Sequence, residues 1–283
     1  MKIGFNLLLW TTHVTDEHLD TLSKLKAAGY DGVEVPIFEG NEAHYLALKQ
    51  KLDDIGLATT VVGIVQDDER NPTGDTPAKR QAGIDYLKWL VDCSNALGAD
   101  VLAGPFYQPL AQFSGAGCTS EEWSYLVSAH KQMAAYAAGS PLNIAVEPLN
   151  RFECYALNTA DAAAKLVTEV GSDNYGYLYD TFHFNIEEKD PVAAIARTAA
   201  QISHVHISEN DRGTPGRGHI HFDAVFSALK SVGYGGWLTI ESFGHALPDL
   251  AAATKIWRPI FDSYEQVYTE GISLIRTGWE SAC

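Results

Sequence analysis

Short apolar runs alternate with longer stretches of helical period along the whole chain. The longer stretches repeat apolar residues every three or four positions, as Leu19, Leu22 and Leu25 do, which is the spacing of one helix face. The short runs have the length and composition of buried strands. We expect strands at Ile3–Leu9, Gly32–Pro36, Ala58–Ile64, Val101–Gly104, Asn143–Glu147, Tyr175–Asp180, Ile202–Ser208 and Gly236–Glu241.

Each expected strand is followed by an expected helix, and several of these helices end at a glycine, such as Gly29 and Gly56. The helices are expected at Thr15–Ala28, Glu42–Ile55, Pro77–Leu97, Ser120–Ala138, Thr159–Val170, Pro191–Ala200, Phe222–Val232 and Leu250–Phe261. One more helix is expected at about Asp262–Arg276, packed outside the other elements or against a partner subunit.

Eight strand–helix repeats are typical of a parallel sheet that closes into a (β/α)₈ barrel. An open, doubly wound sheet is the alternative, but no Gly-x-Gly-x-x-Gly turn follows the first strand. No linker or low-complexity stretch divides the chain. We therefore expect an α/β protein with one barrel domain at residues 1–283, in which residues 262–283 form a C-terminal helical extension.

Composition narrows the choice of partners. The chain has 283 residues and a formal net charge of −16, which repels nucleic acid and anionic membranes and suits a neutral polyol or a cation. The four cysteines form no Cys-x-x-Cys pair, so we expect reduced thiols. Because the chain has no signal-peptide pattern and no apolar run of about 18 residues, we expect a cytoplasmic protein.

Four consecutive strands end in a group that can bind a metal. In a (β/α)₈ barrel the reactive side chains project from the carboxyl ends of the strands, and here these ends carry Glu147, Asp180, His206 and Glu241. Each carboxylate alone is more often a helix cap or half of an ion pair, and the pair His204 and His206 alone is more often hydrogen-bonded within the barrel than bound to a metal. Together, three carboxylates in an apolar barrel mouth need a compensating cation. Three carboxylates and one imidazole favour Mn²⁺, Mg²⁺ or Co²⁺ over a structural zinc.

The loops after these strands carry further polar groups that could face a ligand, namely Glu153, His183 and Arg212. A surface ion-pair network is the alternative interpretation of these three residues. Aromatic residues near other strand ends could line an apolar wall of the pocket or belong to the core. These residues are Phe5, Trp10, Phe106, Tyr107 and Phe243.

Four segments of the second half resemble the ketose 3-epimerases of the xylose-isomerase-like barrel superfamily. The segments are 147–153 (Glu-Pro-Leu-Asn-Arg-Phe-Glu), 180–188 (Asp-Thr-Phe-His-Phe-Asn-Ile-Glu-Glu), 204–212 (His-Val-His-Ile-Ser-Glu-Asn-Asp-Arg) and 216–219 (Gly-Arg-Gly-His). The D-tagatose, D-psicose and L-ribulose 3-epimerases belong to this family, and the chain looks most similar to the L-ribulose 3-epimerases.

The resemblance implies a role for each matching position. It implies a metal, most simply Mn²⁺, held by Glu147, Asp180, His206 and Glu241, with Glu147 and Glu241 also acting as acid and base. It implies that Glu153, His183 and Arg212 hold the carbonyl end of a ketose substrate.

The first half departs from the family pattern, because Val14 and Leu110 stand where several relatives place tryptophan. This departure affects the far end of the substrate pocket. The resemblance also implies a homodimer or homotetramer, and the apolar positions of the last expected helix agree with it. These positions are Val267, Ile272, Leu274, Ile275 and Trp279.

The expected reaction inverts C3 of a free ketose through a cis-enediolate, with one glutamate on each face of the planar carbon. An aldose–ketose isomerase, a hydroxypyruvate isomerase or an inosose-type dehydratase would use the same barrel. An apurinic-site endonuclease shares the Asp-Thr-x-His motif but needs histidines on early strands, where this chain has Gly63 and Gly104. An inactive sugar-binding barrel is the non-enzymatic alternative.

Overall fold

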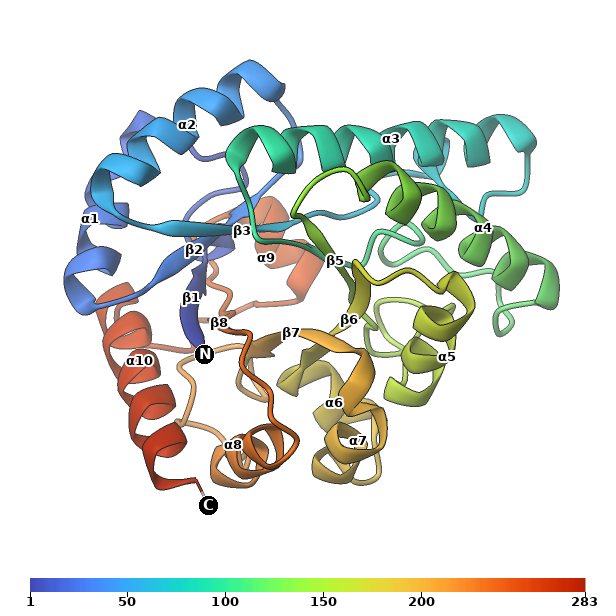
Figure 1. Cartoon of the computed structure of the whole chain (residues 1–283). Helices are drawn as coiled ribbons and strands as arrows, with labels where there is room; N and C mark the ends of the chain where they lie inside the picture. The colour runs from blue at the N-terminus through green and yellow to red at the C-terminus, as the bar shows by residue number, and fades with distance from the viewer. Residues whose placement is uncertain (283) are drawn as a thin grey trace.

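The computed structural model describes residues 1–282 and contains one closed barrel of eight parallel strands (Figure 1). The strands follow one another around the barrel in sequence order, and β8 pairs with β1 to close it. Their bounds are β1 Lys2–Asn6, β2 Gly32–Pro36, β3 Ala58–Val62, β4 Val101–Gly104, β5 Asn143–Val146, β6 Tyr175–Asp180, β7 Ile202–Ile207 and β8 Trp237–Ile240. The predicted (β/α)₈ fold is therefore confirmed.

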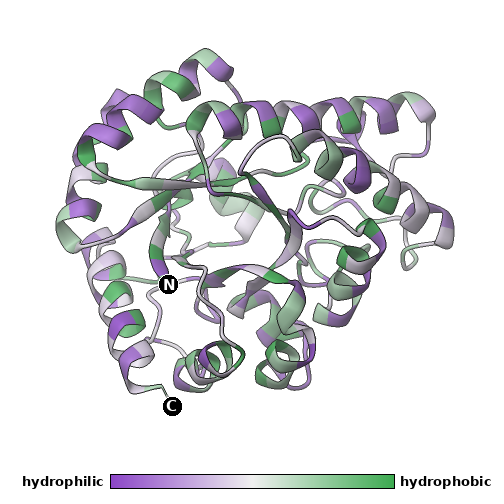
Figure 2. Cartoon of the chain, viewed as in Figure 1, coloured by the Kyte–Doolittle hydropathy of each residue, from purple (hydrophilic) through white to green (hydrophobic). Residues whose placement is uncertain are grey.

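Helices surround the barrel and connect each strand to the next. They are α1 Leu19–Ala28, α2 Glu42–Ile55, α3 Pro77–Leu97, α4 Ser120–Ala137, α5 Ala160–Val170, α6 Thr181–Glu187, α7 Pro191–Thr198, α8 Phe222–Ser231, α9 Pro248–Thr254 and α10 Tyr264–Ser281. Most begin at a side-chain cap, for example Thr119, whose hydroxyl accepts from the backbone N–H of Glu122. Figure 2 shows hydrophilic and hydrophobic positions alternating along these helices, as expected where one face packs on a barrel.

The C-terminal helix is present and longer than expected. α10 packs against α8, α1, β8 and β1, so it completes the ring of helices (Figure 1). Its apolar residues Val267, Ile272 and Ile275 are buried within the chain. The short helix α9 replaces the longer helix expected at Leu250–Phe261.

Several strands end one to three residues earlier than expected. β1 stops at Asn6, whose side chain accepts a hydrogen bond from the N–H of Leu8 and caps a short 3₁₀ helix at Leu7–Leu9. β6 ends at Asp180, which caps α6 in the same way by accepting from the N–H of Phe182. Helix α6 was not expected, since seven residues are too few to show a helical period.

The barrel interior changes character along its axis. The part farther from the mouth is filled by a small apolar cluster of Val101, Ala103, Ala145, Leu178 and Trp237. At the mouth the inward-facing groups are polar and buried, and Glu34, His204 and His206 lie among them. Close contact at this end is possible between β3 and β4 because Gly104 lacks a side chain: a Cβ there would lie 2.0 Å from the Gly63 carbonyl oxygen.

The described residues contain no helix that is long and apolar enough to span a membrane. Cys93, Cys118 and Cys154 are free thiols, whereas Cys283 lies outside the described residues.

Candidate active site

Four side chains from four consecutive strands converge at the barrel mouth. Glu147 directly follows β5, Asp180 ends β6, His206 lies in β7 and Glu241 directly follows β8. One ligand atom from each lies within 4.8 Å of the others, and all four residues are buried. The structure thus brings together every residue that the sequence analysis placed in the metal site.

The spacing of these atoms suits a divalent cation. His206 Nδ1 lies 3.4 Å from Glu241 Oε1, 3.8 Å from Asp180 Oδ2 and 3.9 Å from Glu147 Oε1. Two ligand atoms at about 2.1 Å from one octahedral ion lie about 3 to 4.2 Å apart. His206 Nδ1 is buried and has no hydrogen-bond partner, as expected of an atom whose lone pair is meant for a metal.

Arg212 brings a positive charge to the same cluster. Its Nη1 donates to Asp180 Oδ2 over 3.1 Å, to Glu241 Oε2 over 2.5 Å and to Ser208 Oγ over 3.1 Å. The guanidinium also lies over the Phe182 ring, 3.8 Å from its centroid. Arg212 has a φ of 65°, a left-handed conformation that is uncommon outside glycine and is found at functional positions.

His183, on α6, lies beside Arg212, and each of its two ring nitrogens faces a hydrogen-bond donor. The backbone N–H of Asn150 donates to His183 Nδ1 over 3.1 Å, while Arg212 Nη2 lies 2.8 Å from His183 Nε2. A neutral imidazole can accept only one of these hydrogen bonds. Burial and the charge of Arg212 hold the pKa of His183 well below its usual value, so the ring is neutral.

The carboxyl groups of the site differ in their proton affinity. Burial, followed by the nearby Glu241 carboxylate, raises the pKa of Glu147 well above its usual value. Burial also raises the pKa of Glu153, which accepts a hydrogen bond from Asn150 Nδ2 over 2.8 Å. For Asp180, burial is outweighed by Arg212 and the histidines, so its pKa is lowered.

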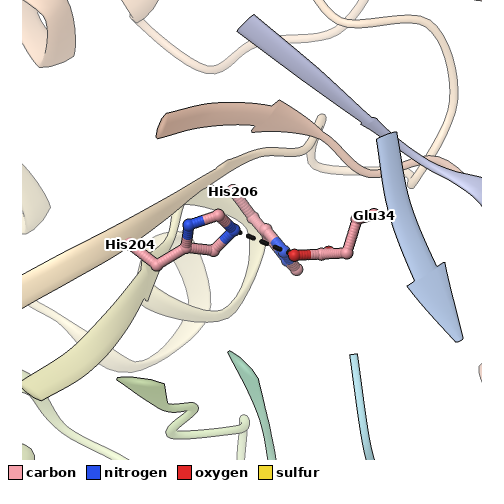
Figure 3. A group of neighbouring side chains, drawn as sticks. All are labelled: Glu34, His204 and His206. Carbon is pink, nitrogen blue, oxygen red and sulfur yellow. Dashed lines mark hydrogen bonds and ion pairs between the residues drawn. The ribbon is translucent and has the colours of Figure 1, made fainter. Parts of the chain in front are cut away.

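The sequence analysis missed two buried groups beneath the site, Glu34 and Asn6. Glu34, in the middle of β2, accepts from Asn6 and Thr60, and its carboxylate lies between His204 and His206 (Figure 3). All five residues are almost completely buried. The available signal was a glutamate between two valines in a strand that is otherwise apolar.

A cavity above the carboxylates has a mostly apolar wall. Among its lining residues are Leu8, Phe38, Ile64, Leu110, Phe243 and Leu250, together with Glu147, Glu153, His183, Arg212 and Glu241. Of the aromatic residues considered from the sequence, Phe243 lines this cavity, whereas Phe5, Phe106 and Tyr107 are completely buried core residues that do not line it. Val14 is also buried and lies away from the cavity.

The fold is a closed eight-stranded barrel whose mouth carries buried carboxylates and a histidine that could hold a metal. Residues 22–276 match the model of the xylose isomerase-like TIM barrel family. The chain belongs to this family.

Several curated relatives match along almost the whole chain. The ketose 3-epimerase of Arthrobacter globiformis is 32% identical over 283 residues, covering 98% of this chain and 96% of the relative. The L-ribulose 3-epimerase of Mesorhizobium japonicum is 31% identical over 290 residues, covering 99% and 95%. The expected resemblance to ketose 3-epimerases is therefore confirmed.

Solved structures agree with these relatives. A structure of L-ribulose 3-epimerase superimposes with a TM-score of 0.93 at 28% identity, covering 99% of this chain and 95% of that one. The D-allulose 3-epimerase of Methylomonas sp., solved in complex with D-allulose, gives a TM-score of 0.91 at 27% identity, covering 98% and 96%. The chain is an enzyme of the isomerase class, a carbohydrate epimerase, as expected.

Proposed function

We propose that this chain is a metal-dependent ketose 3-epimerase that inverts C3 of free ketoses of the L-ribulose, D-psicose/D-fructose and D-tagatose class. The observation that carries the proposal is the convergence of three buried carboxylates and an unpartnered imidazole nitrogen at the barrel mouth. The names of the full-length relatives support the same reaction.

Glu147, Asp180, His206 and Glu241 would hold the cation, which we propose to be Mn²⁺, with Co²⁺ or Mg²⁺ as alternatives. When bound, a divalent cation polarises the C2 carbonyl and the C3 hydroxyl and so makes the C3 proton easier to remove.

Glu147 and Glu241 would exchange the protons. One carboxylate removes the proton from C3, which gives a planar cis-enediolate, and the other returns a proton to the opposite face. The two glutamates follow strands β5 and β8, which are three strands apart in the barrel, so they can approach the sugar from different sides. The raised pKa of Glu147 supports this division, because one of the two groups must hold a proton.

Arg212, His183 and Glu153 would bind the carbonyl end of the ketose. A sugar hydroxyl placed between Arg212 and His183 could accept a hydrogen bond from Arg212. His183 would then have to accept only from the backbone N–H of Asn150. Fixing this end of the sugar leaves C3 between the two glutamates.

The direct test is product analysis with free ketoses. Purified enzyme with Mn²⁺ is incubated with L-ribulose, D-fructose, D-tagatose and hydroxypyruvate, and the products are separated by chromatography. The proposal expects the C3 epimer of a ketose as the first product. An aldose or isomerised hydroxypyruvate would instead support one of the related isomerases.

The remaining alternatives have less support. An apurinic-site endonuclease would need further metal ligands on early strands, and among the described residues β3 and β4 end in Val62 and Gly104. An inactive sugar-binding barrel would not need the complete set of proposed site residues that this chain retains.

We also propose that the enzyme is a homodimer or homotetramer. The apolar face of α10 is used within the chain, so it does not support this proposal. Exposed Phe113, Phe152 and Trp257 support it, since all three lie in loops on the mouth side of the barrel.

A further inference from the structure

One carboxylate contacts two histidines of the same strand. Glu34 Oε2 lies 2.9 Å from His204 Nε2, and Glu34 Oε1 lies 2.7 Å from His206 Nε2 (Figure 3). His204 and His206 are two positions apart in β7, so both side chains point into the barrel, where they meet Glu34 of β2. None of the three residues is exposed to solvent.

The other neighbours of Glu34 decide which atoms carry hydrogen. Asn6 Nδ2 donates to Oε1 over 3.0 Å, and Thr60 Oγ1 donates to Oε2 over 3.1 Å. The carboxylate is therefore surrounded by donors and acts as an acceptor toward all of them. Each histidine consequently carries its hydrogen on Nε2, which leaves Nδ1 of a neutral ring without one.

For His206 this arrangement has a functional consequence. Its Nδ1 faces the carboxylates of Glu147, Asp180 and Glu241 and makes no hydrogen bond. We propose that Glu34 is a positioning residue for the metal site, which holds His206 as the Nε2–H tautomer and aims its Nδ1 lone pair at the cation. The inference rests on the proposed metal-dependent function and adds a residue that contacts neither the cation nor the sugar.

Asn6 extends the same support to a second ligand. Its Nδ2 also lies 3.1 Å from Glu241 Oε1, so one amide joins Glu34 to the glutamate after β8. Glu34 thereby fixes His206 directly and Glu241 through Asn6. Hydrogen bonds of this kind behind metal ligands typically change metal affinity by about 10- to 100-fold.

A second cation between Glu34, His204 and His206 is the competing interpretation, since these three residues also form a compact group. Both Nε2 atoms already lie at hydrogen-bond distance from the carboxylate, whereas two ligands of one ion are usually about 3 Å or more apart. The inference therefore expects one cation per chain.

The test compares metal binding in the wild type and in variants of Glu34. Glu34→Gln keeps the shape but offers one acceptor and one donor, so it cannot accept from both histidines. We expect its affinity for Mn²⁺, measured by titration calorimetry on metal-free protein, to fall about 10- to 100-fold. Thr60→Val is the matched control, because it removes a donor to Glu34 without touching His206. The control is expected to bind within about threefold of the wild type.

A second measurement needs no variant. In the Zn²⁺-saturated wild type, the histidine whose ¹⁵N resonances move on metal addition is expected to retain hydrogen on Nε2 and to bind through Nδ1. Hydrogen on Nδ1 would overturn the inference, even if Glu34→Gln fails to fold.

The outcomes separate the two proposals. A wild type that binds no Mn²⁺ contradicts the metal-dependent function and the role of Glu34 together. A wild type that binds one Mn²⁺, with Glu34→Gln binding it equally well, contradicts the role of Glu34 alone. Two Mn²⁺ ions per chain, with the second lost in Glu34→Gln, would favour the second metal site instead.

Discussion

Arg212 donates a hydrogen bond to Glu241 over 2.5 Å, and both side chains are almost completely buried. This ion pair is part of a cluster in which one guanidinium faces the carboxylates of Glu147, Asp180 and Glu241. A single positive charge cannot balance three buried carboxylates, and burying unbalanced charge is costly. The cluster therefore favours a bound cation.

Removing that cation should abolish activity. We expect extensive treatment with EDTA to stop epimerisation and added Mn²⁺ or Co²⁺ to restore it, because Glu147, Asp180, His206 and Glu241 offer a hard, oxygen-rich ligand set. Elemental analysis must verify that the treated protein is free of metal. Full activity in such protein would contradict the metal hypothesis.

The same cation should stabilise the fold independently of turnover. A ligand that binds only the folded state adds about 2.7 kcal/mol to the free energy of unfolding at 100 times its Kd. We expect urea unfolding of the metal-free enzyme to show this gain when Mn²⁺ is added. The variant Asp180→Asn, which weakens one ligand, should gain less at the same concentration.

A buried histidine outside the site should make the fold sensitive to acid. His130 on α4 is completely buried beside the hydroxyl of Tyr175, and burial lowers the pKa of His130 to about 3. The unfolded chain binds a proton at this residue below about pH 6.5, whereas the folded protein does not until about pH 3. Stability is therefore lost as the pH falls through this window.

The variant His130→Gln isolates this effect. Between pH 6.5 and pH 5, the wild type should lose about 1.6 kcal/mol more free energy of unfolding than the variant, since one linked proton contributes about 1.4 kcal/mol per pH unit once the unfolded histidine is fully protonated. Urea unfolding of both metal-free proteins at several pH values measures the difference. Parallel pH profiles would show that His130 is not the group responsible.

Most of the fold could be predicted from periodicity, because each strand of a parallel barrel is buried on both faces and forms a continuous apolar run. The errors lie where side chains override that pattern. Asn6 and Asp180 each accept a hydrogen bond from the backbone N–H two residues later. At Asn6 this cap ends strand β1 early, and at Asp180 it begins the unexpected helix α6. Hydrophobicity carries no information on such caps.

The candidate site was predictable where its residues sit at strand ends. Because Glu147 and Asp180 lie at the carboxyl ends of their strands, the sequence predicts that they meet at the barrel mouth, and they do so in the structure. Glu34 and Asn6 were not predicted because their partners are distant in sequence: Glu34 and His206 are 172 positions apart. Only the closed barrel makes them neighbours.

The exposed aromatic residues of the mouth loops lead to a prediction about association. Trp257 and Phe152 are each 71% exposed, which is unusual for side chains of this size. We expect sedimentation equilibrium to show a dimer or a tetramer, and the double variant Trp257→Ser/Phe152→Ser to shift it toward monomer. Leu46→Ser, a change at an exposed apolar residue on α2, should leave association unchanged. A wild type that is monomeric at micromolar concentration would contradict the proposed assembly.

The proposed mechanism makes its sharpest prediction for the two glutamates. Glu147→Gln and Glu241→Gln each remove a proton carrier but keep an oxygen that can face the metal. Inversion needs both faces of C3, so each variant should lose turnover by roughly 10²- to 10⁴-fold.

Removal of the C3 proton from one of the two epimers should survive in each of these variants. A variant with one intact carboxylate can still remove the C3 proton from the epimer that presents it to that face. In deuterated solvent, Glu147→Gln should therefore exchange the C3 proton of one epimer, and Glu241→Gln that of the other, as followed by proton NMR. Metal content is measured in both variants, because loss of the cation would also stop turnover. If both retain metal and either one epimerises at nearly the wild-type rate, one base serves both faces, and the division of roles between Glu147 and Glu241 is wrong.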